Sequence, residues 1–347
     1  MKKLIVYNLE TNLDSPVLAA THDWLVSFAD HFDEVTVYST HVGRHNLPHN
    51  VKVVELGGGS ATKRLIAIGR LSRSFLVSIP KRKQLLVFHH MSTRTLLILG
   101  PLYRLLQVKQ ILWYSHSKKS MSLRFSLGYA NKIFTSTQGA FPFNSRNLKY
   151  IGHGIQTQRF REAYRNSKVV RRDAIALGRV AKIKKIEEAI HAIAQLEFSK
   201  IRLICVGNQD ADLSYTTDLT KMSQESKVEI LFKGAINYSQ IPSELANYEY
   251  VYTGTPGSVD KAVIEGACAG CFVITSEESA LQITGMAKIW VQLGHKDIPD
   301  LANQFKILSN LGEEEKERLR LRLSEYACSA NDISQTTKTI MQELDLL

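Results

Sequence analysis

The sequence predicts an α/β protein with two Rossmann-like, doubly wound domains, and three observations favour this fold class. Short runs of Val, Ile, Leu and aromatic residues alternate with longer helical patterns, which is typical of parallel sheets made from βαβ units. The 347 residues exceed the roughly 250–300 that one hydrophobic core usually serves. The alternation stops at the polar stretch 156–172 and then restarts, so we interpret this stretch as a linker.

Six strands are predicted in the first half of the chain, each as a short apolar run bounded by polar or turn residues. They lie at residues 4–7, 34–38, 51–55, 85–89, 111–115 and 133–136. Five more follow in the second half, at residues 174–177, 202–206, 228–233, 250–253 and 272–275. Helices are expected between them, for instance at 186–196 and 261–269, and the chain reads as helical from residue 297 onward.

These elements predict an N-terminal domain at residues 1–165 and a C-terminal domain at 166–325. We expect the last segment, 326–347, to form a helix that returns toward the N-terminal domain. Doubly wound sheets bind ligands at the carboxyl ends of their strands, so the two domains are expected to face a central cleft.

The charge of the chain is unevenly distributed. Residues 1–170 hold 24 Lys and Arg against 8 Asp and Glu, whereas the remainder holds 20 against 25. A basic half attracts phosphate, on a nucleic acid, an anionic lipid or a lipid diphosphate, and composition alone does not choose among these.

The N-terminus has no signal-peptide core, and no apolar run approaches the roughly 18 residues that a membrane span needs. Four cysteines are too few for a disulfide framework. A cytoplasmic protein that does not span a membrane is therefore expected.

A basic amphipathic helix is also predicted near residues 63–76. Its cations interleave with apolar residues and are followed by a basic run; the basic residues are Lys63, Arg64, Arg70, Arg73, Lys81, Arg82 and Lys83, and the apolar ones Leu65, Ile66, Ile68, Leu71, Phe75 and Leu76. The pattern fits peripheral contact with the inner face of a membrane, or a core-facing helix whose basic face is solvated.

Two strand-to-helix turns carry residues that suit an anionic ligand. In ALGRVAKIKK, Gly178 ends a strand, and Arg179 and Lys184 precede a helix, so two cations and free helix amides could face one diphosphate. A solvated basic loop is the alternative. In YTGTPGSVDKAVIEG, a glycine-rich turn precedes a helix on which Glu265 lies one turn beyond Lys261. The alternative is a surface ion pair between these two side chains.

Two further groups of residues have less specific patterns. Cys268 and Cys271 could suggest metal or redox chemistry, although one isolated pair is more typical of helix-to-strand packing. His89 and His90 end a predicted strand and could line an acceptor site, or they could be a satisfied pair at the strand end.

In order and spacing, these segments resemble the retaining GT-B glycosyltransferases of glycosyltransferase family 4. The resemblance runs through ANKIFTST, YIGHGI, ALGRVAKIKKIEEAIHAI, RLICVGN, ILFKGAI and GSVDKAVIEGACAGCFVIT. It implies the GT-B fold, a nucleoside-diphosphate sugar such as a UDP- or GDP-sugar as donor, and a saccharide or lipid-linked acceptor. It implies no metal and no other cofactor.

The resemblance also implies roles for individual residues. Arg179 and Lys184 would grip the donor diphosphate, with Gly178 beside them, and Glu265 would bind the ribose hydroxyls. His116 would lie near the transferred sugar, and Asn12 where an amide meets donor or acceptor. His89 and His90 are acceptor-side candidates from their place at the strand end and not from the resemblance. The remaining donor contacts would come from Lys233, Ala235, Ile236, Gly257, Ser258, Val259, Asp260 and Lys261.

The chain departs from the family pattern at four places. The first strand-to-helix turn, residues 8–15, lacks the usual glycine pair. Gly257 stands where the first Glu of the E-x7-E motif is usual, so the carboxylate near the sugar is missing, and Asp260 is the closest acid in sequence. Gln156 replaces an Asp, and Lys185 replaces the Gly that follows the diphosphate lysine.

The predicted function is retaining sugar transfer in the synthesis of a cell-surface polysaccharide, lipopolysaccharide or glycolipid. The alternative is a non-catalytic nucleotide- or nucleic-acid-binding module that kept the fold. Nucleic acid is not the expected partner, because the basic half lacks the aromatic residues interleaved with charge that single-strand binders use. A hydrolysing epimerase or a phosphorylase fits less well.

Overall fold

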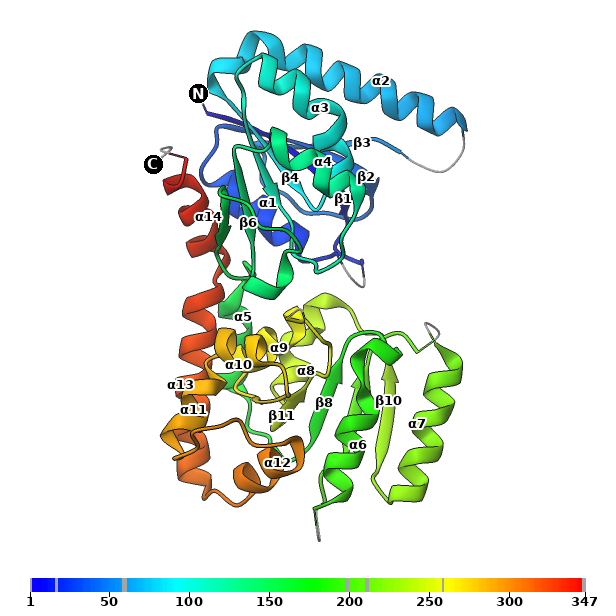
Figure 1. Cartoon of the computed structure of the whole chain (residues 1–347), viewed down its shortest axis with the longest axis vertical. Coiled ribbons are helices and arrows are strands. Elements are labelled where there is room, and N and C mark those ends of the chain that lie inside the picture. The colour runs from blue at the N-terminus through cyan, green and yellow to red at the C-terminus, as the bar shows by residue number, and fades with distance from the viewer. Residues whose placement is uncertain are drawn as a thin grey trace. The chain divides into compact units, whose positions relative to one another are not determined.

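The computed structural model describes residues 2–15, 18–57, 61–196, 200–209, 212–257 and 259–344, without the side chains of 61–65 and 81. The chain forms two compact units, the first comprising Met1–Gly154 and Ile333–Leu347 and the second comprising Ile155–Asp332 (Figure 1). Each unit contains a parallel sheet with helices between most successive strands, so the predicted α/β class is confirmed.

The first unit contains a seven-stranded parallel sheet in the order β3-β2-β1-β4-β5-β6-β7. Its strands are β1 (Lys3–Thr11), β2 (Glu34–Val42), β3 (Val51–Glu55), β4 (Leu85–His90), β5 (Lys109–Trp113), β6 (Lys132–Thr135) and β7 (Leu148–Tyr150). The first six overlap the predicted strands. The edge strand β7 was missed because it has only three residues, LKY, which are too few to show a period of two.

Helices cover both faces of this sheet. They are α1 (Thr21–Ala29), α2 (Ala61–Ser78), α3 (Thr93–Leu105), α4 (Met121–Ser126) and α14 (Ile333–Gln342), with short 3-10 turns at Ile79–Gln84, Leu127–Tyr129 and Gln138–Ala140. Side chains of a strand alternate between the faces. Leu4 and Val6 of β1 therefore pack in the cluster that holds α1 and α14, while Ile5 and Tyr7 pack in the cluster that holds α2 and α3.

The second unit contains a five-stranded parallel sheet in the order β10-β9-β8-β11-β12. Its strands are β8 (Ala174–Leu177), β9 (Leu203–Val206), β10 (Ile230–Gly234), β11 (Tyr250–Tyr252) and β12 (Phe272–Ile274). Its helices are α5 (Thr157–Asn166), α6 (Ile186–Ala194), α7 (Leu213–Ser226), α8 (Ile241–Leu245), α9 (Lys261–Cys268), α10 (Glu278–Thr284), α11 (Met286–Gln292), α12 (Leu301–Ser309) and α13 (Glu313–Asn331), with 3-10 turns at Lys182–Lys184 and Tyr238–Gln240.

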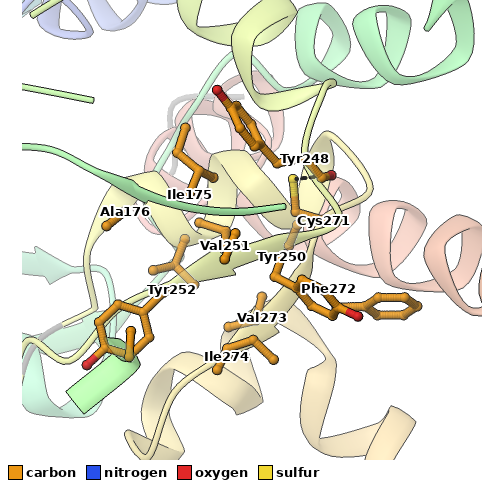
Figure 2. Close-up of a cluster of buried hydrophobic side chains, with 14 of the residues drawn as sticks. Ile175, Ala176, Tyr248, Tyr250, Val251, Tyr252, Cys271, Phe272, Val273 and Ile274 are labelled. Atoms are coloured by element: carbon orange, nitrogen blue, oxygen red, sulfur yellow. Dashed lines mark hydrogen bonds between the residues drawn. The ribbon is translucent and has the colours of Figure 1, made fainter. Parts of the chain in front are cut away.

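Three neighbouring strands form the centre of the second core. Figure 2 shows Ile175, Val251 and Val273, which are cross-strand partners on β8, β11 and β12 and have no exposed surface. Burying each such side chain stabilises the fold by about 1.5–3 kcal/mol. This core fixes the carboxyl ends of the strands, from which the candidate site projects.

The predicted linker at 156–172 differs from the structure. Its first part forms α5, which belongs to the second unit because Phe160 and Tyr164, one turn apart, are buried in that unit. The unit boundary therefore follows Gly154, ahead of the expected residue 165. At the other end, α13 stays in the second unit, and only the chain from Ile333 onward belongs to the first.

Candidate functional site

The loop between β8 and α6 forms one side of the candidate site in the second unit. Gly178 has a φ of +119°, and its amide donates to the Val206 carbonyl at 2.8 Å. A Cβ on Gly207 would lie 1.9 Å from the Gly178 carbonyl oxygen, so the two turns meet backbone to backbone. Arg179 follows, exposed, and within the described ranges its guanidinium has no hydrogen-bond or ion-pair partner.

The ammonium of Lys184 is paired with a carboxylate from the second motif. Its Nζ lies 2.6 Å from Asp260 Oδ2, and the hydroxyls of Thr255 and Thr253 donate to that same oxygen at 2.6 and 3.0 Å. Burial disfavours ionisation of Asp260, but the charge of Lys184 and these three donors outweigh it and lower the pKa of the carboxyl below its usual value. Asp260 is therefore an ionised carboxylate at neutral pH.

Several groups fix the turn that presents Lys184. The next residue, Lys185, has the left-handed angles φ 48° and ψ 45°. The Tyr252 hydroxyl donates to the Lys185 carbonyl at 2.6 Å, and the Ile186 amide donates to the Tyr215 hydroxyl at 2.7 Å. A glycine is the residue best suited to these angles, so a lysine is held here at some cost in backbone strain.

Glu265 is buried on α9, with only 2% of its side chain exposed. Its Oε1 accepts from Lys261 Nζ at 3.1 Å and from the Tyr238 hydroxyl at 3.0 Å, so the predicted Lys261 to Glu265 ion pair exists but is not a surface pair. The Tyr238 ring also receives Lys261 at 4.2 Å and the guanidinium of Arg159 at 4.3 Å. A buried carboxylate held by two donors is a fixed acceptor for further hydroxyl groups.

The predicted donor contacts after β10 are more exposed. Lys233 Nζ donates to Glu244 Oε1 at 2.7 Å and to the Tyr248 hydroxyl at 2.9 Å, so its charge is already neutralised. Ala235 is exposed, and Ile236 is partly buried against the core of the unit.

The turn before α9 brings a further carboxylate beside Gly257. The Gly257 amide donates to Glu277 Oε2 at 3.2 Å, so a carboxylate from the loop after β12 contacts this position. Val259 is buried, and Ser258 lies outside the described residues.

In the first unit, Asn12 and His116 follow β1 and β5, at the carboxyl edge of that sheet. Asn12 Nδ2 donates to Glu10 Oε1 at 3.1 Å, and its Oδ1 accepts from the Asp14 amide at 3.1 Å. His116 is exposed, and its Nδ1 accepts from the Lys118 amide at 2.9 Å. In the neutral ring the proton therefore resides on Nε2, which can donate to a ligand.

His89 and His90 are buried in the first unit. The His89 ring stacks on Tyr7, with centroids 5.3 Å apart, and its Nδ1 lies 2.9 Å from Thr95 Oγ1. The His90 ring packs edge-on against Trp24 at 5.6 Å. Burial lowers the pKa of His89 to about 3 and that of His90 to about 4, so both rings are neutral core groups at physiological pH.

The cysteines of the second unit are also core residues. Cys271 Sγ donates to the Leu245 carbonyl at 3.2 Å, and burial raises its pKa to about 11 (Figure 2). In the part of the chain that the structure describes, no three His, Cys, Asp or Glu side chains gather as a metal site requires.

Sequence reasoning missed Thr253, Thr255, Tyr238, Arg159 and Glu277. The two threonines flank Gly254 just beyond the end of β11, and their place in the same turn as Asp260 could have suggested that their hydroxyls reach its carboxylate. The other three reach the site from separate elements, and no local pattern marks them.

No protein-family model matches the chain, and a search of curated proteins finds no match to its sequence. Solved structures do match its fold over almost its whole length. Anabaena HepE in complex with UDP has a TM-score of 0.72 at 14% identity and covers 100% of both chains. The chain has the GT-B fold.

Two further GT-B structures match over similar lengths. Sucrose-phosphate synthase from Thermosynechococcus elongatus has a TM-score of 0.69 at 14% identity, covering 99% of each chain. The lipopolysaccharide outer core galactosyltransferase WaaB has a TM-score of 0.65 at 8% identity, covering 99% of this chain and 100% of its own. In the described residues of the GT-B chain, every helix is too short or too polar to cross a bilayer.

Proposed function

We propose that this protein is a retaining glycosyltransferase that moves a sugar from a nucleoside-diphosphate sugar, a UDP- or GDP-sugar, to a saccharide or lipid-linked acceptor. The observation that carries the proposal is the pairing of two motifs at one edge of the second sheet. Gly178, Arg179, Lys184 and Asp260 line a common pocket there, and Glu265 lies one turn further along α9.

Arg179 and Lys184 supply positive charge where a diphosphate would leave. As the bond between the anomeric carbon and the phosphate oxygen breaks, its electron pair passes to the phosphate, and two cations stabilise that charge. The same oxygen takes the proton of the acceptor hydroxyl on the same face of the sugar, while the acceptor oxygen bonds to the anomeric carbon. This route needs no protein nucleophile and no metal.

Other residues would position the two substrates. Glu265, fixed by Lys261 and Tyr238, is suited to accept hydrogen bonds from the ribose hydroxyls. His116 would donate from Nε2 to the transferred sugar. The structural neighbours support this donor class, because HepE was solved with UDP-glucose as well as with UDP.

The direct test is incubation of the purified protein with UDP-, GDP-, ADP- and CMP-sugars, followed by mass spectrometry for hydrolysis or transfer. Lys184→Ala should reduce turnover at least about 100-fold, since it removes charge from the leaving group. Lys182→Ala is the matched control, because this exposed lysine of the same loop should tolerate the change. Absence of turnover with every donor, together with no effect of Lys184→Ala on nucleotide binding, would contradict the proposal.

We further propose that the first unit docks on the anionic inner face of a membrane, on the cytoplasmic side, as synthesis of a polysaccharide, lipopolysaccharide or glycolipid would require. Between Glu55 and Glu162 the sequence contains no Asp or Glu. Within this segment, α3 exposes Ile98, Leu102 and Leu105, and α4, which packs on α3, exposes Met121 and Phe125. Leu105 is 81% exposed and Phe125 60%.

This surface combines apolar side chains with cations. Arg94, Arg104 and Arg124 lie on the same helices, and α2, which packs beside α3 (Figure 1), exposes Arg70 and Arg73. The predicted contributions of Lys63, Arg64, Leu65 and Lys81 concern side chains outside the described residues. Apolar area and basic charge together favour an interfacial position on anionic lipid.

Flotation with phosphatidylglycerol vesicles tests the docking surface. Leu105→Glu and Phe125→Glu should abolish flotation at low salt, whereas Leu213→Glu should not, because Leu213, 65% exposed, belongs to the second unit. Binding should also weaken as salt rises. Equal flotation of all three variants would contradict the proposal that the surface on α3 and α4 binds anionic lipid.

A further inference from the structure

In the free protein the ammonium of Lys184 is paired with Asp260, and this pair bears on how a nucleotide is bound and released. Lys184 and Asp260 form a 2.6 Å ion pair in which only 18% and 23% of the two side chains are exposed. The pocket that they line with Gly178 and Arg179 has a volume of about 10 Å³, room for about one water molecule. Because the ammonium is already paired with Asp260, a diphosphate must compete with this carboxylate for Lys184.

Asp260 can lose Lys184 without becoming an unsatisfied buried charge. Thr255 and Thr253 donate to Oδ2, the same oxygen that Lys184 contacts, at 2.6 and 3.0 Å. A buried carboxylate that loses its only partner is strongly destabilising, whereas one that keeps two hydroxyl donors is not stranded. The two threonines therefore make the ion pair separable.

The position of Asp260 at the start of α9 also indicates that its side chain serves Lys184. Asp260 is the N-cap residue of α9, where an aspartate usually accepts from the amides of the first turn and stabilises the helix by about 1 kcal/mol. Here the side chain makes no capping hydrogen bond and turns toward Lys184 instead. Of the first-turn amides of α9, that of Val263 donates to the Asp260 carbonyl at 3.1 Å, and none donates to the Asp260 side chain.

We propose that Lys184 exchanges partners during each turnover, pairing with Asp260 in the free protein and with the diphosphate in the loaded protein. This inference rests on the proposed function. Asp260 competes with the nucleoside diphosphate for the ammonium, and the ion pair that re-forms after sugar transfer promotes product release. Asp260 is thus a positioning residue that acts through Lys184, while the exposed Arg179 makes the first contact with the diphosphate.

Isothermal titration of the full chain with UDP, or with GDP if UDP does not bind, tests this exchange. Asp260→Asn keeps the size of the side chain and removes the competing charge, so it should tighten binding about ten-fold, which corresponds to ~1.4 kcal/mol. Lys184→Ala should weaken binding. In the double variant Asp260→Asn/Lys184→Ala the tightening should vanish, because no ammonium remains to be released.

A second variant moves the affinity in the opposite direction. Thr255→Val keeps the shape and the charge of the site but removes one donor from Asp260. The carboxylate then depends more on Lys184, and UDP binding should weaken about 2- to 10-fold, the value of one hydrogen bond. Circular dichroism and thermal unfolding confirm that each variant is folded.

The outcomes separate the two proposals. Weaker or unchanged binding in folded Asp260→Asn would overturn the exchange and leave Asp260 as a scaffold for Lys184, while the glycosyltransferase proposal would stand. If the unaltered protein binds neither UDP nor GDP, the proposed function itself fails. In steady-state assays, the exchange predicts that Asp260→Asn lowers KM for the donor and lowers kcat together, because slower product release limits turnover.

Discussion

At the scale of single residues, the candidate site depends on side chains that the sequence places far apart. Lys184 and Asp260 belong to two motifs separated by 76 residues, and each motif alone also fits a solvated loop. The 2.6 Å contact between them, together with the two threonine hydroxyls that donate to Asp260, joins the two motifs in one site. Residue type and spacing predicted both motifs, but the pairing required the fold.

Lys185 provides a test of backbone strain beside the site. It adopts φ 48°, where a Cβ costs about 1–2 kcal/mol, and its side chain pairs with Glu188 at 3.0 Å on the surface. Lys185→Gly and Lys185→Ala both remove this ion pair, but only Lys185→Gly relieves the strain. Urea denaturation should find Lys185→Gly more stable than Lys185→Ala by about 1 kcal/mol. Equal stabilities would show that the turn relaxes when the lysine is replaced.

At the scale of elements, the sequence predicted most strands well, whereas it did not predict the helix α5. The apolar run 174–177 coincides with β8, because a strand covered on both faces is apolar along its whole length. The run 51–55 coincides with the edge strand β3, where three valines mark the strand although none of its residues is fully buried. The helix α5 was interpreted as a linker because charged residues dominate it, and only its buried aromatic pair, one turn apart, marks the packed face.

Elements of the site were predicted to a similar degree. The turns after β8 and before α9 follow from glycine placement, and the structure brings both to one pocket. Tyr238 and Glu277 were missed because their positions depend on how β10 and β12 are ordered in the sheet. His89 and His90 end a strand as expected, but their rings turn into the core, which a sequence pattern at a strand end cannot distinguish.

Replacing a helix glycine by alanine should have opposite effects on stability at Gly266 of α9, which packs on the sheet, and at Gly69 of α2. A Cβ on Gly266 of α9 would lie 2.7 Å from Val251 Cγ1 and 2.8 Å from its Cβ, on a central strand. Gly266→Ala should therefore destabilise the second unit by about 1–3 kcal/mol. Gly69 of α2 has open space around it, so Gly69→Ala should stabilise the first unit by about 0.5–1 kcal/mol. Thermal unfolding of both variants would measure the contrast, and a stabilising Gly266→Ala would contradict this packing.

At the scale of the whole molecule, the first unit is built from two separate parts of the chain. The last helix, α14, contributes Ile333, Ile340 and Met341 to the same core as Leu4 and Phe28. The segment from Ile333 onward thus belongs to the first unit. The N-terminal core therefore cannot be complete until α14 has been synthesised.

The two units carry tryptophans that can report on them separately. Trp24 and Trp113 are buried in the first unit, and Trp290 is buried in the second. Ile340 is fully buried in the first, so Ile340→Ala should lower the free energy of unfolding of that unit by about 2–5 kcal/mol.

This effect can be assigned to one unit by fluorescence. In a Trp290→Phe background the urea transition should move to lower denaturant, whereas in a Trp24→Phe/Trp113→Phe background it should stay in place. The reason is that Ile340 contributes nothing to the core around Trp290. If Ile340→Ala shifts both signals equally, the two units unfold as one cooperative body, and the stability of the second unit then depends on α14.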